Sequence, residues 1–201
     1  IPVIASQKSF LLQNQCLKLM RLWRNTLAAN KYLFVKNKFR YNVKEFSSSA
    51  DQALLKEILA LNQDNTPEVG NLASIKELQN LARQSSNNYY ISIKDEIIAF
   101  MICFREKSDY HSENYKFFSK KEKKFLYVDR IAIKDTYRRK GIAKNLYSMI
   151  EIQANAESIP LCCEVNTIPL NDISIKFHED FGFLQVGKHD FTDHSVAYFQ
   201  K

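Results

Sequence analysis

The segment Tyr137-Arg138-Arg139-Lys140-Gly141-Ile142-Ala143 is the stretch of sequence that decides the fold. It follows an apolar run over 128–133 that is typical of a strand, and it leads into a helix predicted over 141–157. The first N–H groups of a helix lack internal partners and lie at the positive end of its dipole, so they bind phosphate readily. Gly141 lets a phosphate approach the backbone. Taken alone, the segment predicts a phosphate site and an ordinary basic helix cap equally well.

On both sides of this segment the residue pattern predicts alternating elements. Ser49 and Gln52 form a predicted capping box, and Asp95 and Glu96 form a tight turn between two strands. A polar and aromatic loop occupies 105–124. The predicted elements, in order, span 39–44, 49–61, 72–83, 89–94, 97–104, 125–133, 141–157, 161–166, 171–181, 183–186 and 195–200. This β-α-α-β-β-β-α-β-α-β-β order predicts an α/β sandwich, a mixed sheet with helices on both faces.

The composition is that of a globular protein with one main domain, which we place at 39–201. Of the 201 residues, 45% are hydrophobic and 25% are charged, and no run approaches the roughly 20 apolar residues that a membrane span needs. The net charge of +7 is uneven, because nine lysines and arginines precede Glu45, the first acidic residue. The excess positive charge therefore lies in residues 1–38, which we interpret as a solvated basic arm. Nucleic acid is not expected as a partner, since the arm lacks a recognisable reading helix.

Within the arm, apolar residues recur at the spacing of one helical stripe: Leu12, Cys16, Leu19, Trp23 and Leu27. The pattern fits an organellar presequence or a docking helix, so organellar import stays open beside the cytoplasmic location that we expect. The four cysteines show no metal-type spacing, and Cys162 and Cys163 are adjacent in an apolar run. We predict reduced, buried thiols.

Two motifs at a suitable separation give the sequence its family resemblance. The first is Arg138-x-x-Gly141-x-Ala143, and the second is Asn171-x-x-Ser174-x-x-Phe177-His178-Glu179-x-x-Gly182-Phe183. From about Phe39 to the C-terminus the chain resembles the GNAT superfamily of N-acetyltransferases. The runs 127–131, 164–166 and 109–115 are similar to a subgroup of predicted acetyltransferases whose acceptor is unassigned.

The resemblance implies a mainly antiparallel GNAT-type sheet that binds acetyl-CoA between the strands at 125–133 and 161–166, where the two splay apart. Pantetheine would bind the backbone near Ile131 and Ile133, and the pyrophosphate would lie at the start of the helix. Ala143 departs from the more usual glycine, which the motif tolerates. The implied cofactor-binding residues are Ile131, Ala132, Ile133, Arg138, Arg139, Lys140, Gly141, Ile142, Ala143, Asn171 and Ser174.

Attack by an amine on a thioester needs a base, since a lysine amine has a pKa of ~10.4 and is mostly protonated near neutrality. Strand alternation places Glu164 as a carboxylate in an apolar strand, where desolvation raises a carboxyl pKa. Members of the family that acetylate protein N-termini are similar in having Glu there. The alternative is a Glu164 paired with Arg130 or a lysine. Asp129 is the second base candidate, with an ion pair to Arg130 as its alternative.

His178 stands where many family members have a tyrosine that is assigned as the acid for the departing thiolate. A histidine could donate that proton, or it could be held structurally by hydrogen bonds. The 105–124 loop offers polar groups for an acceptor, with packing as the alternative role of its aromatic rings. The predicted acceptor-binding residues are Tyr110, Ser112, Asn114, Tyr115 and Tyr127.

These features together predict transfer of an acetyl group from acetyl-CoA to a primary amine by direct attack in a ternary complex. The alternative is a non-catalytic module that senses acyl-CoA. A homodimer is compatible with the sequence. No metal is expected, although five residues invite that interpretation: His111, His189, Asp190, Asp193 and His194.

Overall fold

The computed structural model describes residues 32–36 and 39–201, and the chain divides into two compact units, residues 1–44 and 45–201. In the first unit, β1 (Tyr32–Lys36) pairs antiparallel with β2 (Phe39–Glu45), with Tyr32 opposite Val43. The sequence predicted β2 but not β1. The predicted helical stripe at 12–27 lies outside the described residues.

The second unit contains five helices and six strands in its described residues, and each begins or ends within a few residues of its predicted range except where stated below. The helices are α2 (Gln52–Gln63), α3 (Ile75–Gln84), α4 (Glu113–Lys121), α5 (Ile142–Glu157) and α6 (Asp172–Asp180), with a 3-10 turn η1 (Asp135–Tyr137). The strands are β3 (Asn87–Ile93), β4 (Glu96–Arg105), β5 (Leu126–Ile133), β6 (Leu161–Ile168), β7 (Leu184–Asp190) and β8 (Ser195–Gln200).

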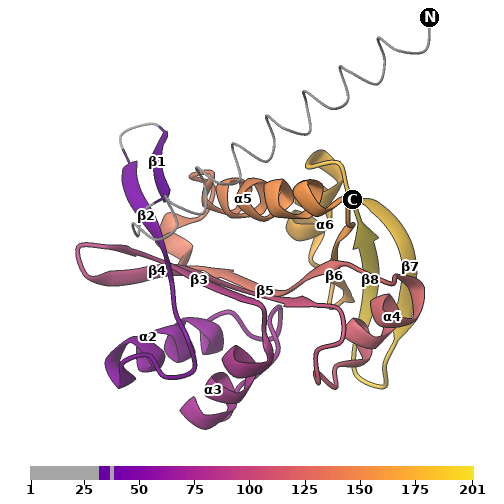
Figure 1. Ribbon diagram of the computed structural model, residues 1–201, viewed down its shortest axis with the longest axis horizontal. Helices are drawn as coiled ribbons and strands as arrows, with labels where there is room; N and C mark the ends of the chain where they lie inside the picture. The colour runs from indigo at the N-terminus through magenta and orange to yellow at the C-terminus, as the bar shows by residue number, and fades with distance from the viewer. Residues whose placement is uncertain (1–31, 37–38) are drawn as a thin grey trace, which may run out of the picture. The chain divides into compact units, whose positions relative to one another are not determined.

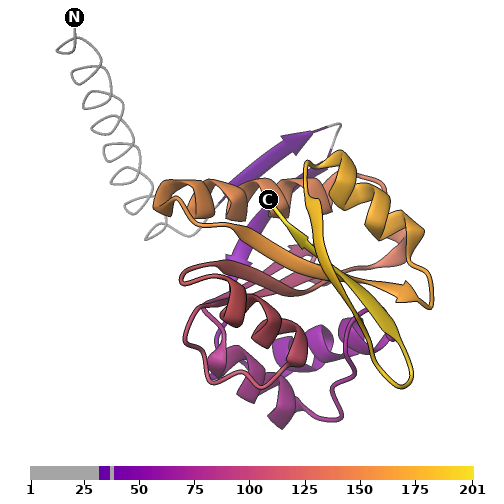
Figure 2. The same ribbon diagram turned by 90° about the vertical axis from the view of Figure 1, so that its right-hand side faces the viewer.

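The strands of this unit form one sheet in the order β3-β4-β5-β6-β8-β7, in which only β5 and β6 run parallel. Helices α2, α3 and α4 cover one face, and α5 and α6 cover the other, as Figures 1 and 2 show from two directions. The predicted fold class, a mixed and mainly antiparallel sheet between helices, is confirmed. Strand β4, which is buried except at its two end residues, lies between β3 and β5 at the centre of the core.

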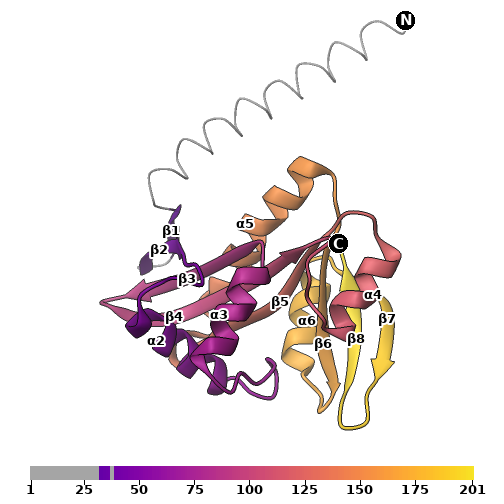
Figure 3. The same ribbon diagram turned by 60° about the horizontal axis from the view of Figure 1, so that its bottom comes forward.

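The sheet opens between β5 and β6. Leu126, Tyr127 and Val128 pair with Leu161, Cys162 and Cys163, and no pairing continues beyond them. Both strands extend several residues further, so they diverge, and Figure 3 shows β6 running on beside α6. A β-bulge falls at the same point, because Val128 and Arg130 pair with consecutive residues of β4 and Asp129 is the extra residue. The expected splay is therefore present, with a bulge at its origin.

Helix α4 was not predicted; the loop expected at 105–124 contains it. Ser112 caps its first turn, Glu113 lies in that turn, and Lys120 and Lys121 lie in the last turn, where charges of those signs favour a helix. Its only fully buried residues are Tyr115 and Phe118. Two fully buried positions are too few to reveal a helical period.

Two local predictions were wrong by a few residues. Asp51, not Ser49, caps α2, since its carboxylate accepts from the N–H of Ala53. The β3–β4 turn is formed by Lys94 and Asp95, both at positive φ (49° and 65°), and Glu96 already belongs to β4. Two consecutive residues of positive φ give the turn a twist that matches the flanking strands.

Candidate active site

A hollow of about 100 Å³ lies where β5 and β6 diverge. It is lined from both sides of the sheet, which means that it passes between the two strands. Its lining residues are Asn65, Glu68, Val69, Val128, Asp129, Arg130, Ile131, Tyr147, Cys163, Glu164, Val165, Asn166, Asn171, Ser174 and His178. The structure thus brings six of the predicted site residues together at one hollow: Asp129, Ile131, Glu164, Asn171, Ser174 and His178.

Glu164 faces the side of the sheet that α2, α3 and α4 cover. Its Oε2 accepts a 2.5 Å hydrogen bond from the Tyr127 hydroxyl, and its Oε1 accepts a 3.2 Å bond from the Asn114 side-chain amide of α4. Burial, and then the nearby charge of Asp129, raise the pKa of Glu164 to about 8. Within the described residues no arginine or lysine pairs with it, so the alternative of an ion-paired Glu164 does not hold for them.

Asp129 is held on both carboxylate oxygens. Tyr110 donates to Oδ1 at 2.6 Å, and Arg130 donates to Oδ2 at 2.8 Å. The Arg130 guanidinium also donates to Asn62 Oδ1 and to the Gly70 carbonyl, which ties β5 to the segment after α2. The side chains of Asp129 and Arg130 are only 4% and 7% exposed. The ion pair that the sequence left open is present.

The opposite side of the opening, under α5 and α6, contains two aromatic side chains that are joined by a hydrogen bond. The Tyr147 hydroxyl and His178 Nε2 lie 2.7 Å apart, and His178 Nδ1 lies 2.7 Å from the Ser174 carbonyl. A carbonyl oxygen only accepts, so Nδ1 carries the hydrogen. Burial lowers the pKa of His178 to about 4, so the ring is neutral near neutral pH, and Nε2 accepts from Tyr147.

The cysteines near the opening do not offer a nucleophile. Cys103, Cys162 and Cys163 are free and buried, as predicted, and Cys16 lies outside the described residues. Burial raises the pKa of each of the three thiols. A thiol held protonated in this way reacts poorly with a thioester.

The edge of β5 past the bulge presents backbone groups to the opening. In an antiparallel pair, every second residue of a strand bonds to its neighbour. The N–H of Lys134 donates to the Ile98 carbonyl of β4, so Ala132, two residues earlier, also bonds to β4. The backbone N–H and C=O groups of Ile131 and Ile133 therefore point away from β4, toward the edge of β5 from which β6 has diverged. The Ile133 carbonyl accepts from Arg138 Nε at 3.1 Å. The groups of Ile131 suit an extended, amide-containing ligand.

The start of α5 has the form of an anion cradle. Gly141 caps the helix with φ of 83°, no side chain caps it, and a Cβ at this position would meet no atom within 4 Å. Arg139 also has positive φ (62°), which curves the turn. Arg138 bonds to Asn65 and Asp135, and Lys140 donates to the Thr136 carbonyl, so these two side chains brace the turn. The helix start offers its N–H groups, including those of Ile142 and Ala143, to a phosphate.

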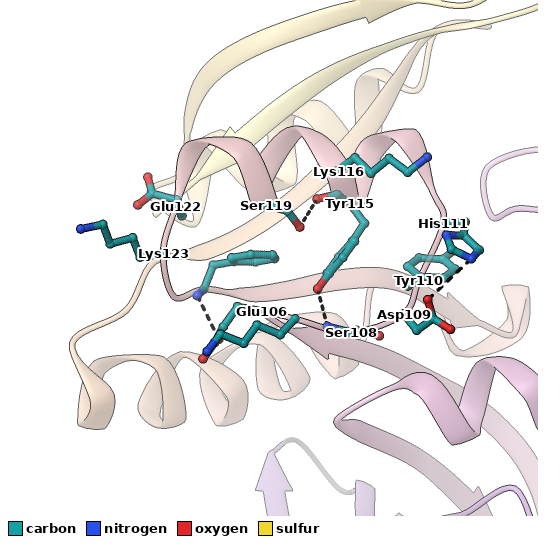
Figure 4. A pocket seen from close by; sticks show the side chains of 12 residues that line it. Glu106, Ser108, Asp109, Tyr110, His111, Tyr115, Lys116, Ser119, Glu122 and Lys123 are labelled. Carbon is teal, nitrogen blue, oxygen red and sulfur yellow. Dashed lines mark hydrogen bonds and ion pairs between the residues drawn. The ribbon is translucent and has the colours of Figure 1, made fainter.

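Of the predicted acceptor-binding residues, Tyr110, Asn114 and Tyr127 contact the two carboxylates. Ser112 and Tyr115 have structural contacts instead: Ser112 caps α4, and the Tyr115 hydroxyl bonds to the Ser108 N–H and the Arg105 carbonyl. Figure 4 shows Tyr115 in a second, larger hollow of about 500 Å³ between α4 and residues 106–111. Tyr110 lines this hollow too, but neither Glu164 nor Asp129 does.

Other site residues escaped prediction because their roles depend on tertiary contacts. Tyr147 is buried on α5, and Tyr198 and Asn62 come from distant parts of the chain. A polar-tipped aromatic residue on an inward helix face was the one available signal. Across the described ranges, no group of three or more His, Cys, Asp or Glu side chains could hold a metal ion, and no helix is long and apolar enough to cross a membrane.

Comparison with known proteins identifies the family. The model of the acetyltransferase (GNAT) family matches residues 55–183, which is more than half of the sequence, and the chain therefore belongs to the GNAT family. No curated protein sequence matches it.

Solved structures show the same fold at low sequence identity. One is the Arabidopsis thaliana NAA60 in complex with acetyl-CoA (17% identity, 80% of this chain and 97% of that chain covered, TM-score 0.61). Others are an N-acetyltransferase from Staphylococcus aureus (19%, 80% and 97%, 0.57) and the ribosomal-protein-S18-alanine N-acetyltransferase from Escherichia coli (14%, 80% and 92%, 0.56).

Proposed function

We propose that this protein transfers an acetyl group from acetyl-CoA to a primary amine by direct attack within a ternary complex. The observation that carries the proposal is the opening between β5 and β6, which has a buried carboxylate of raised pKa on one side and an anion cradle at the start of α5. The family membership supports the acetyltransferase chemistry, and one neighbour of the same fold is in complex with acetyl-CoA.

Acetyl-CoA fits the residues that are present. The backbone of Ile131 would hold the pantetheine amides, and the N–H groups from Gly141 onward would hold the pyrophosphate. Asn171 and Ser174 line the same opening from α6. No side chain at Gly141 or Ala143 is large enough to block the approach.

Glu164 acts as the general base in this proposal. A carboxylate with a pKa of about 8 is ionised in part near neutral pH and is basic enough to take a proton from the ammonium group, which frees the nitrogen lone pair before the amine attacks the thioester carbon. Asp129 is less suited, because Arg130 and Tyr110 already occupy both of its oxygens. Asp129 instead places negative charge beside an incoming cationic amine.

The departing sulfur would meet the Tyr147 hydroxyl on the other side of the sheet, and the single hydroxyl proton would turn from His178 Nε2 to the sulfur as the C–S bond breaks. His178 is neutral and accepts from Tyr147, so it positions that hydroxyl and is a poor proton donor itself. With no activated thiol at the opening, direct attack is preferred over an acyl-enzyme on cysteine.

The test is a thiol-release assay with acetyl-CoA and a panel of amines: amino acids, polyamines, aminoglycosides and peptides with free N-termini. The proposal expects amine-dependent release of CoA and an acetylated product of matching mass. Tight acetyl-CoA binding with no release for any amine between pH 6 and 9 would refute it and favour an acyl-CoA sensor.

A further inference from the structure

We propose that Asn114 is a positioning residue for Glu164, and that α4 serves to deliver this amide to the carboxylate. The inference rests on the proposed role of Glu164 as the base. It assigns a part in the site to a helix whose other contacts look like ordinary packing.

The contacts of Glu164 leave a defined space for the acceptor. Asn114 donates to Oε1 and Tyr127 donates to Oε2, so each oxygen is fixed by one hydrogen bond. An ionised carboxylate can accept two hydrogen bonds on each oxygen, so one lone pair of each stays available. The plane of the carboxylate is thereby set before a substrate arrives.

Tyr198 holds the oxygen end of the Asn114 amide. Its hydroxyl donates to Asn114 Oδ1 at 3.0 Å, and this bond leaves the NH₂ end of the amide directed at Glu164. Tyr198 lies opposite Glu164 in the β6–β8 register, so the two residues are fixed relative to each other by the sheet. A flipped amide would place its oxygen against the Glu164 carboxylate, which only accepts when ionised, so the carboxylate sets the orientation of the amide.

Helix α4 is anchored to β8 by aromatic packing that depends on one glycine. The Phe117 ring stacks on Tyr198 with centroids 4.0 Å apart, and Phe118 meets the same ring edge-on at 5.6 Å. Gly187 of β7 lies opposite Tyr198, and a Cβ there would approach Phe117 Cζ to 2.8 Å. A side chain at 187 would push the Phe117 ring off Tyr198. Gly187 therefore makes room for the contact that places Asn114.

The effect of Asn114 is electrostatic as well as geometric, because an amide N–H favours the ionised carboxylate and lowers the pKa of Glu164. Several ionisable groups act on the same carboxylate from the surrounding elements. They are Asp129, Tyr110, Tyr127, Tyr147 and Tyr198, and the ionisable residues Glu68, Arg130 and His178 line the same hollow.

The test compares the pH dependence of kcat/KM for the wild type, Asn114→Leu and Asn114→Asp in the full chain. Leu removes the donor, and Asp also adds a like charge. We expect the acidic limb of the profile to move to higher pH by roughly one unit in Asn114→Leu and by more in Asn114→Asp. At a fixed pH below the limb, a shift of one unit lowers kcat/KM about tenfold. The Kd of acetyl-CoA should stay within about twofold.

A second variant acts from a distance. Gly187→Ala does not touch Glu164, yet it should move the acidic limb in the same direction, whereas Leu184→Ala on the same strand, at a side chain 73% exposed, should not. A uniform loss of activity with an unmoved limb in Asn114→Leu would overturn the inference. Full activity of Glu164→Gln would instead overturn the base assignment beneath it.

Discussion

The burial of Glu164 makes the stability of the protein depend on pH in a way that one substitution removes. Its pKa rises from an ordinary 4.5 to about 8 on folding. Between these values the folded protein keeps a proton that the unfolded chain has lost, so the free energy of unfolding falls as pH rises. At about 1.4 kcal/mol per pH unit, a window of about 3.5 units gives an upper limit of ~5 kcal/mol. Glu164 as a whole residue is half-buried, so screening by water makes the actual loss smaller.

Glu164→Gln has nearly the same shape and does not titrate, so the comparison isolates this group. Urea unfolding at pH 5, 6.5 and 8 measures the stability of both proteins. From pH 5 to pH 8, the free energy of unfolding of the variant should increase by several kcal/mol relative to that of the wild type. His178, neutral in the folded protein, gives an opposite slope below its ordinary pKa of 6.5, but it contributes equally to both proteins. A difference that stays constant with pH would refute the buried-carboxyl reasoning.

Three further outcomes are expected. For the chemical step, Glu164→Gln should lower kcat by about 10²-fold or more with little change in acetyl-CoA affinity, as titration calorimetry can check; a full-rate variant would contradict the base role. Arg130→Met leaves Asp129 buried without its cation and should cost roughly 3–5 kcal/mol in unfolding free energy, whereas a loss below 1 kcal/mol would mean that the pair contributes little. Tyr147→Phe should lower kcat more than His178→Gln does, because glutamine keeps an acceptor for the Tyr147 hydroxyl. Single-turnover experiments measure both rates, and a larger loss in His178→Gln would identify His178 as the proton donor.

Signals that are local in the sequence predicted the fold and the strand or helix on which several of the site residues lie. Strand alternation placed Glu164 correctly in an apolar strand, and the residues around Gly141 and Asn171 marked two helix starts that the structure confirms. Each of these features is encoded within a few neighbouring residues. The order of elements then restricted the sheet to one with helices on both faces.

Features that depend on contacts between distant segments could not be predicted. Helix α4 has only two fully buried residues, and its place is fixed by Tyr198, more than 70 residues further along the chain. The neutral state of His178 depends on burial between α5 and β8 and on a hydroxyl from another helix. Its sequence context, a histidine on a polar helix stripe, gives no information on that burial.

The central claim is that the start of α5 binds the pyrophosphate of acetyl-CoA, and a matched pair of variants tests it. Asparagine tolerates the positive φ of Gly141, and aspartate has the same shape with a negative charge. Calorimetry should show acetyl-CoA binding at least tenfold weaker for Gly141→Asp than for Gly141→Asn, with no such difference for S-acetylpantetheine, which lacks the pyrophosphate. Equal acetyl-CoA affinity of the two folded variants would contradict the claim.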